Sequence, residues 1–391
     1  MILTNARLFD GTGKLWERAT IRLDGTRIAS VSGDAPAGVA PDETVIDLAG
    51  KNVIPGLINC HTHICLDGSG DPSANWNRQT LTRNVLKAAR HAERTLRAGV
   101  TTVRDLGGME YVDVSLRDAI KAGVVPGPRM KVSGKVICMT GGHGWGVGGR
   151  EADGPAETRK AAREQLKAGA DVIKVMATGG VMTFGVEPGS HQLTYEEMRA
   201  AIEEAEKTGK LTASHAQGAA GIKAVVKAGI DSVEHGFFLD DEAIDLMLEN
   251  GTYFVPTLAA LYYIIAAGPD AGIPTFMVEK AKRCSDAQLE SVAKAWKAGI
   301  PIATGNDGGT PFNTSDNLAG ELERLVAIGL TPEQTLLAAT QIASKLLRMQ
   351  GEIGSVEAGK LADMVVLGGD PLEDISNVRD VDLVIKDGQV V

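Results

Sequence analysis

The stretch KAGADVIKVM at residues 167–176 decides the fold. It begins with the end of a helical segment and a glycine, the residue that most easily adopts the left-handed conformation that closes a helix. The segment that follows is apolar almost throughout, so it predicts a strand that is buried on both faces. A helix that leads directly into such a strand is the repeating unit of a parallel α/β fold.

The same unit recurs along the middle of the chain. It reads LRAGVTTV at residues 96–103, KAGIDSVEH at 227–235 and KAGIPIA at 297–303. The spacing leaves room for a further strand and helix between some of these units. Roughly 290 residues of this pattern favour a (β/α)8 TIM barrel, although the pattern alone leaves an open sheet as the alternative.

The two ends of the chain follow another pattern, in which short strands alternate with turn residues. Strands are predicted at residues 2–3, 6–8, 20–23, 28–31, 363–367 and 384–390. We therefore expect the two termini to pair into one small β-sandwich, into which the barrel is inserted. The predicted division is residues 1–55 and 351–391 for the sandwich, and residues 56–350 for the barrel.

The composition narrows the class of protein. Of the 391 residues, 43% are hydrophobic and 23% are charged, the balance of a globular protein with a large core. A net charge of -10 argues against nucleic acid and anionic membranes as partners. The sequence has no apolar run of about 18 residues, the length that a membrane span needs, and no signal-peptide pattern is found. Four cysteines without a CxxC pair are expected to be reduced thiols, so the sequence predicts a cytoplasmic protein.

Two histidines follow the first predicted barrel strand, in the sequence NCHTH at residues 59–63. Because they lie two residues apart on a strand, His61 and His63 point to the same face. Two imidazoles on one face can bind a zinc-like cation. Cys60 points the other way and is expected to pack in the core. Cys65 has the parity of a third ligand, but the strand is expected to end before it.

Lys174 interrupts the apolar strand of residues 172–176. A lysine in such a strand extends its amine to solvent, finds a partner or loses its proton. A neutral amine can also add carbon dioxide, and the resulting carbamate has two oxygens that could bridge two cations. The residues alone leave the solvent-directed amine and the carbamate open.

Three further polar residues, His215, His235 and Asp307, each lie at the end of a predicted strand with a glycine soon after. In a barrel the active site lies at the carboxyl ends of the strands. The barrel would therefore bring these residues together with the histidine pair and the lysine. Since the chain has only seven histidines, coincidence explains this gathering poorly, and the sequence predicts a metal site.

Other residues could contact a substrate. His143 lies in a glycine-rich loop, where it could polarise a carbonyl or form a hydrogen bond within the loop. Tyr262 and Tyr263 could line the pocket or pack in the core. His191, ahead of a predicted helix, could lie at the rim, whereas His91 within a helix is expected to be structural or exposed.

These motifs together resemble the amidohydrolase superfamily, and specifically its binuclear members with a carboxylated lysine. The resemblance spans the chain and rests on VIPGLINCHTH at residues 53–63, VEHG at 233–236, TGND at 304–307 and GSVEAGKLAD at 354–363. Two further motifs, IKVMATGG at 173–180 and GHG at 142–144, are similar to the prolidase-like branch of Xaa-Pro dipeptidases.

The resemblance implies a metal-dependent hydrolase with two divalent cations. It implies that His61, His63 and Asp307 hold the more buried cation, and that His215 and His235 hold the other. Zinc suits these nitrogen and oxygen ligands, although manganese, cobalt or iron could replace it.

The resemblance also implies the catalytic roles. Lys174, as a carbamate derived from carbon dioxide, would bridge both cations together with a hydroxide that attacks the substrate. Asp307 would accept the proton of that hydroxide and pass it to the leaving amine. His143 would polarise the carbonyl or bind the oxyanion.

One residue departs from the prolidase-like pattern. Some members carry a tyrosine that meets the substrate's carboxylate, and Gln217 takes its place here. A neutral amide supplies no charge, so this residue favours uncharged amides, carbamates or ureas as substrates.

Three functional interpretations follow. The first is hydrolysis of a linear amide bond in a small molecule, by a dipeptidase or an N-acyl or aryl amidase. The second keeps the metal centre but acts on a cyclic amide, lactone, carbamate or organophosphate ester. The third is a metal-binding scaffold without activity, which is disfavoured because Asp307 and Lys174 would have almost no role in it. A homo-oligomer is expected by analogy only.

Overall fold

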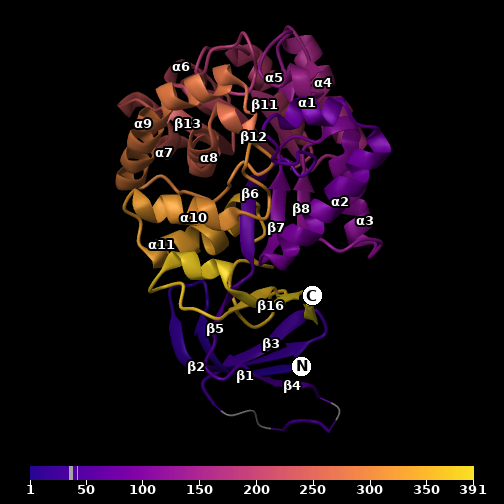
Figure 1. Ribbon diagram of the computed structural model, residues 1–391, viewed down its shortest axis with the longest axis vertical. Helices are drawn as coiled ribbons and strands as arrows, with labels where there is room; N and C mark the ends of the chain where they lie inside the picture. Colours follow the sequence, from indigo (N-terminus) through magenta and orange to yellow (C-terminus); the bar gives the residue numbers. More distant parts are fainter. Residues whose placement is uncertain (35–37, 42) are drawn as a thin grey trace.

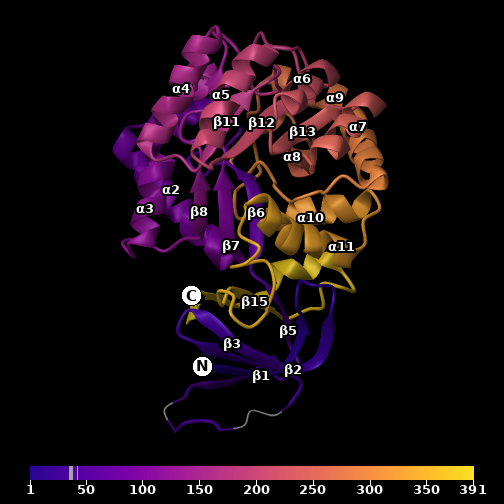
Figure 2. The ribbon, with the colours of Figure 1, turned by 180° about the vertical axis from the view of Figure 1, so that it is seen from behind.

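The protein is described by a computed structural model that covers residues 1–34, 38–41 and 43–391. A β-sheet that holds both chain ends lies at one end of the molecule, and a larger α/β part lies at the other (Figure 1). Helices surround the strands of the larger part in both views (Figure 2). The chain crosses into this part between β5 (Asn52–Pro55) and β6 (Leu57–Thr62).

Strands from both ends of the chain form one hydrogen-bonded sheet. Strand β5 pairs on one side with β1 (Ile2–Phe9) and on the other with β15 (Met364–Leu367), where Val53 lies opposite Val366. The remaining strands of this sheet are β2 (Leu15–Asp24), β3 (Arg27–Ser32), β4 (Val45–Asp47), β16 (Val381–Lys386) and β17 (Gln389–Val390). The strands expected at both chain ends therefore share a sheet, whereas a two-layered sandwich stays a prediction.

A partly buried arginine links this sheet to the α/β part. Arg129 forms ion pairs with Asp363, at 2.5 Å, and with Asp387. Burial opposes the charge of the guanidinium, but the two carboxylates raise its pKa. The pairing holds the C-terminal strands against the start of β8 (Arg129–Val132).

The strands of the α/β part are parallel, as the sequence predicts. One sheet contains β6, β7 (Val100–Asp105) and β8. The other contains, in spatial order, β10 (Arg150–Glu151), β9 (Ile137–Cys138), β11 (Val172–Met176), β12 (Leu211–Gly218), β13 (Ser232–Phe238) and β14 (Tyr253–Val255). Parallel strands of this kind are consistent with a barrel.

Backbone hydrogen bonds connect the two sheets at both sides. The segment of residues 301–308 lies between β14 and β6: Ala303 N donates to Phe254 O at 2.9 Å, and Cys60 N donates to Thr304 O at 2.8 Å. On the other side, Asp171 N donates to Val132 O at 2.7 Å. The carboxyl ends of all these segments therefore face the same space.

The fourth repeating unit differs from the prediction. Its helix ends at Ala298 and Gly299 has a φ of 90°, as expected. Residues 300–303, however, form only an isolated bridge, between Ile302 and Phe254. The cause is Pro301, which has no N–H to donate to a ladder.

Helices cover the outside of the parallel strands. They are α1 (Pro72–Asn77), α2 (Leu81–Arg97), α3 (Val112–Lys121), α4 (Pro155–Ala168), α5 (Tyr195–Lys207), α6 (Ala219–Lys227), α7 (Asp241–Asn250), α8 (Leu258–Ala267), α9 (Thr275–Ala298), α10 (Leu318–Ala327), α11 (Pro332–Leu337) and α12 (Ala343–Leu346). Short 3-10 helices lie at Met109–Tyr111, Trp145–Val147, Pro269–Ala271 and Ile375–Arg379, and a π-helix lies at Ala338–Ile342.

The alternation of side chains along the strands separates the core from the site. Ile173 and Val175 of β11 pack into the core that the strands share with the helices. Lys174 between them points to the opposite face, because successive side chains of a strand alternate. Among the described residues, no helix is both long and apolar enough to cross a membrane.

Candidate metal centre

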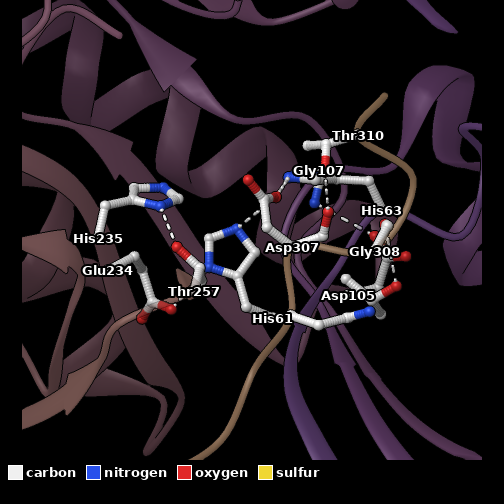
Figure 3. Close-up of polar contacts among 12 residues, drawn as sticks. His61, His63, Asp105, Gly107, Glu234, His235, Thr257, Asp307, Gly308 and Thr310 are labelled. Atoms are coloured by element: carbon white, nitrogen blue, oxygen red, sulfur yellow. Dashed lines mark hydrogen bonds and ion pairs between the residues drawn. The ribbon is translucent and has the colours of Figure 1, made fainter. Parts of the chain in front are cut away.

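Three predicted ligands form a compact group at the strand ends. His61 and His63 come from the end of β6, and Asp307 comes from the segment that lies beside it (Figure 3). Asp307 Oδ1 lies 3.4 Å from His61 Nε2 and 3.2 Å from His63 Nε2. Potential ligand atoms of all three residues lie within 4.8 Å of one another, so they could hold one metal ion.

The remaining predicted histidines continue from this group. The ring centroids of His61 and His235 are 5.0 Å apart, and those of His235 and His215 are 4.5 Å apart. His143 follows at 4.3 Å from His215. The structure thus brings the predicted histidines of β6, β12, β13 and the glycine-rich loop into one cluster.

Lys174 lies beside the cluster with an unsatisfied amine. It is 1% exposed, and its Nζ has no hydrogen-bond partner among the described residues. Burial lowers its pKa to about 8. Because the side chain is buried, its amine does not extend to solvent. A buried amine without a partner is costly when it is charged. This amine lines the same cavity as the histidines and Asp307.

Burial disfavours the charged form of four histidines of the cluster. It lowers the pKa of His235 and of His143 to about 3, and it lowers the pKa of His61 and of His215 well below the ordinary value. A neutral imidazole has one nitrogen with a free lone pair, which is the form that binds cations. The cluster is therefore suited to a positive ion.

Asp307 supplies the negative charge of the site. Burial would raise the pKa of its carboxyl, but His61 and His63 hold that pKa well below its usual range. Burial likewise opposes a charge on His63, and Asp307 outweighs it and raises the pKa of this histidine. The carboxylate is therefore ionised and can bind a cation or accept a proton.

Two of the predicted site residues have a strained backbone. His235 has a φ of 74° and Asp307 a φ of 56°, in the left-handed region that residues with a side chain rarely adopt. Such conformations persist only where the surrounding structure enforces them, and they cluster at functional sites.

A buried ionic network that the sequence analysis missed supports His61. Glu234 Oε2 lies 2.8 Å from His61 Nδ1, and Arg104 Nη2 donates to Glu234 Oε1 at 2.8 Å. Arg104 also donates to Cys60 O at 2.6 Å and to Ser232 Oγ at 2.9 Å. The signal was present: Arg104 and Glu234 are charged residues inside strands that are otherwise buried.

The sequence analysis also missed two smaller sets of contacts beside the cluster. Thr257 Oγ1 lies 2.7 Å from His235 Nδ1 (Figure 3). Asp105 accepts hydrogen bonds from Ile64 N at 2.6 Å and Gly107 N at 3.2 Å, which fixes the turn beside His63.

The cluster lies at the base of a cavity of about 250 Å³. Most of the lining is apolar and includes Met109, Val136, Met176, Phe184, Phe237 and Leu261. Of the residues that the structure describes, the lining includes two lysines, Lys135 and Lys174, and no arginine. The cavity therefore suits a small, largely apolar molecule.

A model of the amidohydrolase family matches residues 52–391. The chain belongs to the amidohydrolase family. Members of this family typically use a divalent metal centre, and the group of His61, His63 and Asp307 could bind such an ion. Together with the hydrolases among its relatives, the family shows that this amidohydrolase is an enzyme that acts on C–N bonds.

The amidohydrolase is similar to several known proteins. Ochratoxinase from Aspergillus niger is 33% identical over 351 residues, covering 83% of this chain and 71% of the relative. The structure of a Xaa-Pro dipeptidase with methionine bound in the active site matches with a TM-score of 0.92 and 35% identity, over 100% of this chain and 99% of the other. A prolidase in complex with N-methylphosphonate-L-proline matches with a TM-score of 0.91 and 31% identity, over 100% and 98%.

The residues of the amidohydrolase that were predicted to contact a substrate do not all line the cavity. Gln217 lines the cavity, and its Oε1 has no hydrogen-bond partner within the described part of the chain. His143 also lines it, with Nδ1 at 2.8 Å from Thr183 Oγ1. Both residues are therefore placed to meet a bound molecule.

The prediction for Tyr262 and Tyr263 is not supported. Helix α8 turns Ala260, Leu261 and Ile264 to the cavity, and neither tyrosine is part of the described lining. Tyr262 is 46% exposed and its ring packs under the Arg324 guanidinium.

The other histidines and the cysteines considered in the sequence analysis lie outside the cluster. His91 Nδ1 lies 2.9 Å from Ile64 O, a structural contact, and His191 is exposed. The four cysteines are free and buried, and Cys65 packs in a hydrophobic core.

Proposed function

We propose that this amidohydrolase cleaves the linear amide bond of a small substrate, as a dipeptidase or an N-acyl or aryl amidase. The observation that carries the proposal is the buried amine of Lys174, which has no hydrogen-bond partner among the described residues and lies next to four histidines and Asp307 at the strand ends. As a carbamate, this lysine would supply oxygen ligands to a metal centre.

In this proposal His61, His63 and Asp307 hold one cation, and His215 and His235 hold the second. Lys174, if carboxylated by carbon dioxide, would supply further oxygen donors to this centre. Zinc fits the nitrogen and oxygen donors. The short separations of the donor atoms and the neutral imidazoles support this assignment.

When bound, the two cations would lower the pKa of a shared water and polarise the scissile carbonyl. Asp307 accepts the water's proton and delivers it to the leaving nitrogen, a role that its ionised state supports. His143 is neutral, and Thr183 at its Nδ1 leaves the other ring nitrogen to donate to the carbonyl oxygen. The apolar walls exclude bulk water from these steps.

The lining of the cavity favours substrates with an apolar group. Lys135, the cation at the wall apart from Lys174, already pairs with Glu110 at 3.1 Å. Gln217 offers hydrogen bonds but no charge, so N-acyl or aryl amides are the preferred substrates. The likeness to a Xaa-Pro dipeptidase and to a prolidase keeps dipeptides as the second candidate.

A substrate screen tests the proposal. Zinc-reconstituted protein is assayed against dipeptides, N-acyl amino acids, anilides, carbamates and lactones, with Asp307→Asn as the inactive control. We expect turnover of anilides or N-acyl amides that Asp307→Asn lowers by at least about 100-fold. Turnover of lactones or phosphotriesters without any amide hydrolysis would overturn it, and full activity of the variant would remove the role of Asp307.

The proposal includes the architecture and setting expected from the sequence. Residues 56–350 would form a closed (β/α)8 barrel that carries the site, and residues 1–55 and 351–391 would form the sandwich. The four free cysteines fit a reducing compartment such as the cytoplasm. A homo-oligomer stays an expectation by analogy.

A further inference from the structure

The first turn of helix α8 lies directly against the metal cluster and has an unusual cap. Thr257 occupies the N-cap position, where a threonine hydroxyl ordinarily accepts a hydrogen bond from the helix. Here its side chain makes no bond to the helix. Its Oγ1 lies instead 2.7 Å from His235 Nδ1.

A residue far along the chain accepts the hydrogen bonds of the first turn of α8 in place of Thr257. The carboxylate of Glu321, from α10, accepts from Leu258 N at 3.0 Å and from Ala259 N at 2.7 Å, one bond to each oxygen. These are the first two N–H groups of α8, which otherwise lack partners in a helix. Glu321 and Thr257 are both 0% exposed, so water does not take over either role.

The backbone of Thr257 depends on this arrangement. Its φ of 53° lies in the left-handed region, where a β-branched residue is a genuine outlier. A strained residue keeps such a conformation only if bonds on several sides hold it. The bond to His235 and the anchored first turn of α8 lie on either side of it.

We propose that Glu321 is a positioning residue for His235. By capping α8 from outside, it frees the Thr257 hydroxyl to accept the Nδ1 proton of His235, so that Nε2 keeps its lone pair for a cation. The inference rests on the proposed function in one respect, namely that His235 is a metal ligand.

The alternative is that Glu321 only stabilises α8. In that case its loss lowers the stability of the protein without changing the tautomer of His235. Without Glu321, in contrast, the two N–H groups of α8 compete for the Thr257 hydroxyl, which then turns from the imidazole to the helix. The two readings therefore differ at the ring of His235, even in metal-free protein.

The first experiment measures metal binding. Glu321→Ala and Glu321→Gln are compared with wild type and with Glu323→Ala, a control on the same helix whose carboxylate pairs with Arg379 at 2.7 Å. We expect the zinc that His215 and His235 would hold to dissociate roughly 10- to 100-fold more readily in Glu321→Ala, with the other zinc unchanged. Glu321→Gln, which keeps one acceptor, should fall in between, and Glu323→Ala should match wild type.

The second experiment shows whether the effect passes through Thr257. Thr257→Val keeps the shape of the side chain but removes its hydroxyl. If Glu321 acts through this hydroxyl, Glu321→Ala causes no further loss of zinc affinity in the Thr257→Val background. Additive losses would overturn the proposal in favour of a purely structural role.

The third measurement is independent of metal and of substrate. In metal-free protein, nitrogen-edited NMR of the histidine side chains should show a protected Nδ1 proton on His235 in wild type, and its loss in Glu321→Ala. An unchanged signal overturns the positioning role even if activity falls. If the signal behaves as expected but no amide is hydrolysed, the proposed function fails and the positioning of His235 stands.

Discussion

His61 Nδ1 lies 2.8 Å from the buried carboxylate of Glu234, on the side of the ring opposite to Asp307. Since a carboxylate can only accept, Nδ1 carries the proton and Nε2 keeps its lone pair toward Asp307. Glu234 is in turn held by Arg104. The orientation of the ring is therefore fixed before any cation arrives.

Replacing Glu234 should weaken metal binding more than it disturbs the fold. Glu234→Gln can present an N–H to His61 and favour the other tautomer, so we expect roughly 10- to 100-fold weaker binding of the zinc that His61 would hold. Equilibrium dialysis against a chelator measures this loss. Glu206→Gln, at an ion pair on the surface of α5, is the matched control. Equal zinc retention in both variants would contradict the role of Glu234.

Arg104 should matter for stability rather than for the tautomer. Arg104→Met leaves the Glu234 carboxylate buried without its cation, which typically costs about 3–5 kcal/mol. We expect a lower midpoint of urea unfolding for this variant. A midpoint equal to that of wild type would show that His61 and Ser232 alone satisfy the carboxylate.

Lys174 should make the stability of metal-free protein depend on pH. Burial lowers its pKa from 10.5 to about 8, so the folded state disfavours the charged amine. The resulting cost is complete below about pH 8 and disappears as the pH rises toward 10.5. In buffer without carbon dioxide, Lys174→Met should therefore be the more stable protein at pH 7, by an amount on the order of 3 kcal/mol at most. Calorimetry at pH 7 and pH 10 should show this advantage shrink, and a constant difference would contradict it.

Asp113 offers a second pH test, away from the cluster. Burial and the neighbouring Asp105 raise the pKa of Asp113 to about 7, and Oδ2 accepts from Gly134 N at 2.8 Å. The folded state thus prefers the protonated acid, and this stabilisation is lost as the pH rises from about 4 through 7. Asp113→Asn, which stays neutral, should gain stability relative to wild type across that range. Urea midpoints of the two proteins that run parallel with pH would contradict the assignment.

Gln217 should control the charge of the preferred substrate. Gln217→Arg places a cation in the cavity wall, and a hydrogen bond to a charged group contributes about 1.5–3 kcal/mol. We expect kcat/KM for dipeptides to rise at least about 10-fold relative to N-acyl amides with no free carboxylate. Gln217→Leu, which adds no charge, should give no such rise. The same ratio in both variants would place carboxylate recognition elsewhere.

The cluster itself was predictable because it depends on few rules. Parallel strands bring their carboxyl ends to one edge, and the two-residue period of β11 sets Lys174 opposite Ile173. These rules act over short stretches of sequence, so the sequence alone predicts that the histidines and Asp307 lie together.

The supporting contacts could not be predicted in this way. Glu321 meets Leu258 across 63 positions of sequence, and Arg104 meets Glu234 across 130. No local pattern encodes such partners. The position of Tyr262 could not be predicted for another reason: α8 is apolar on nearly all sides, so helical periodicity does not reveal which face meets the cavity.

The pairing of β5 with β15 has a consequence for the newly made chain. Val53 leaves the ribosome about 300 residues before its partner Val366, a delay of roughly 15–60 s at ordinary rates of synthesis. During that time one edge of β5 has no neighbour, and an open strand edge invites pairing with other chains. The yield of soluble protein should therefore depend on how this edge is shielded during translation, more than on the final stability of the enzyme.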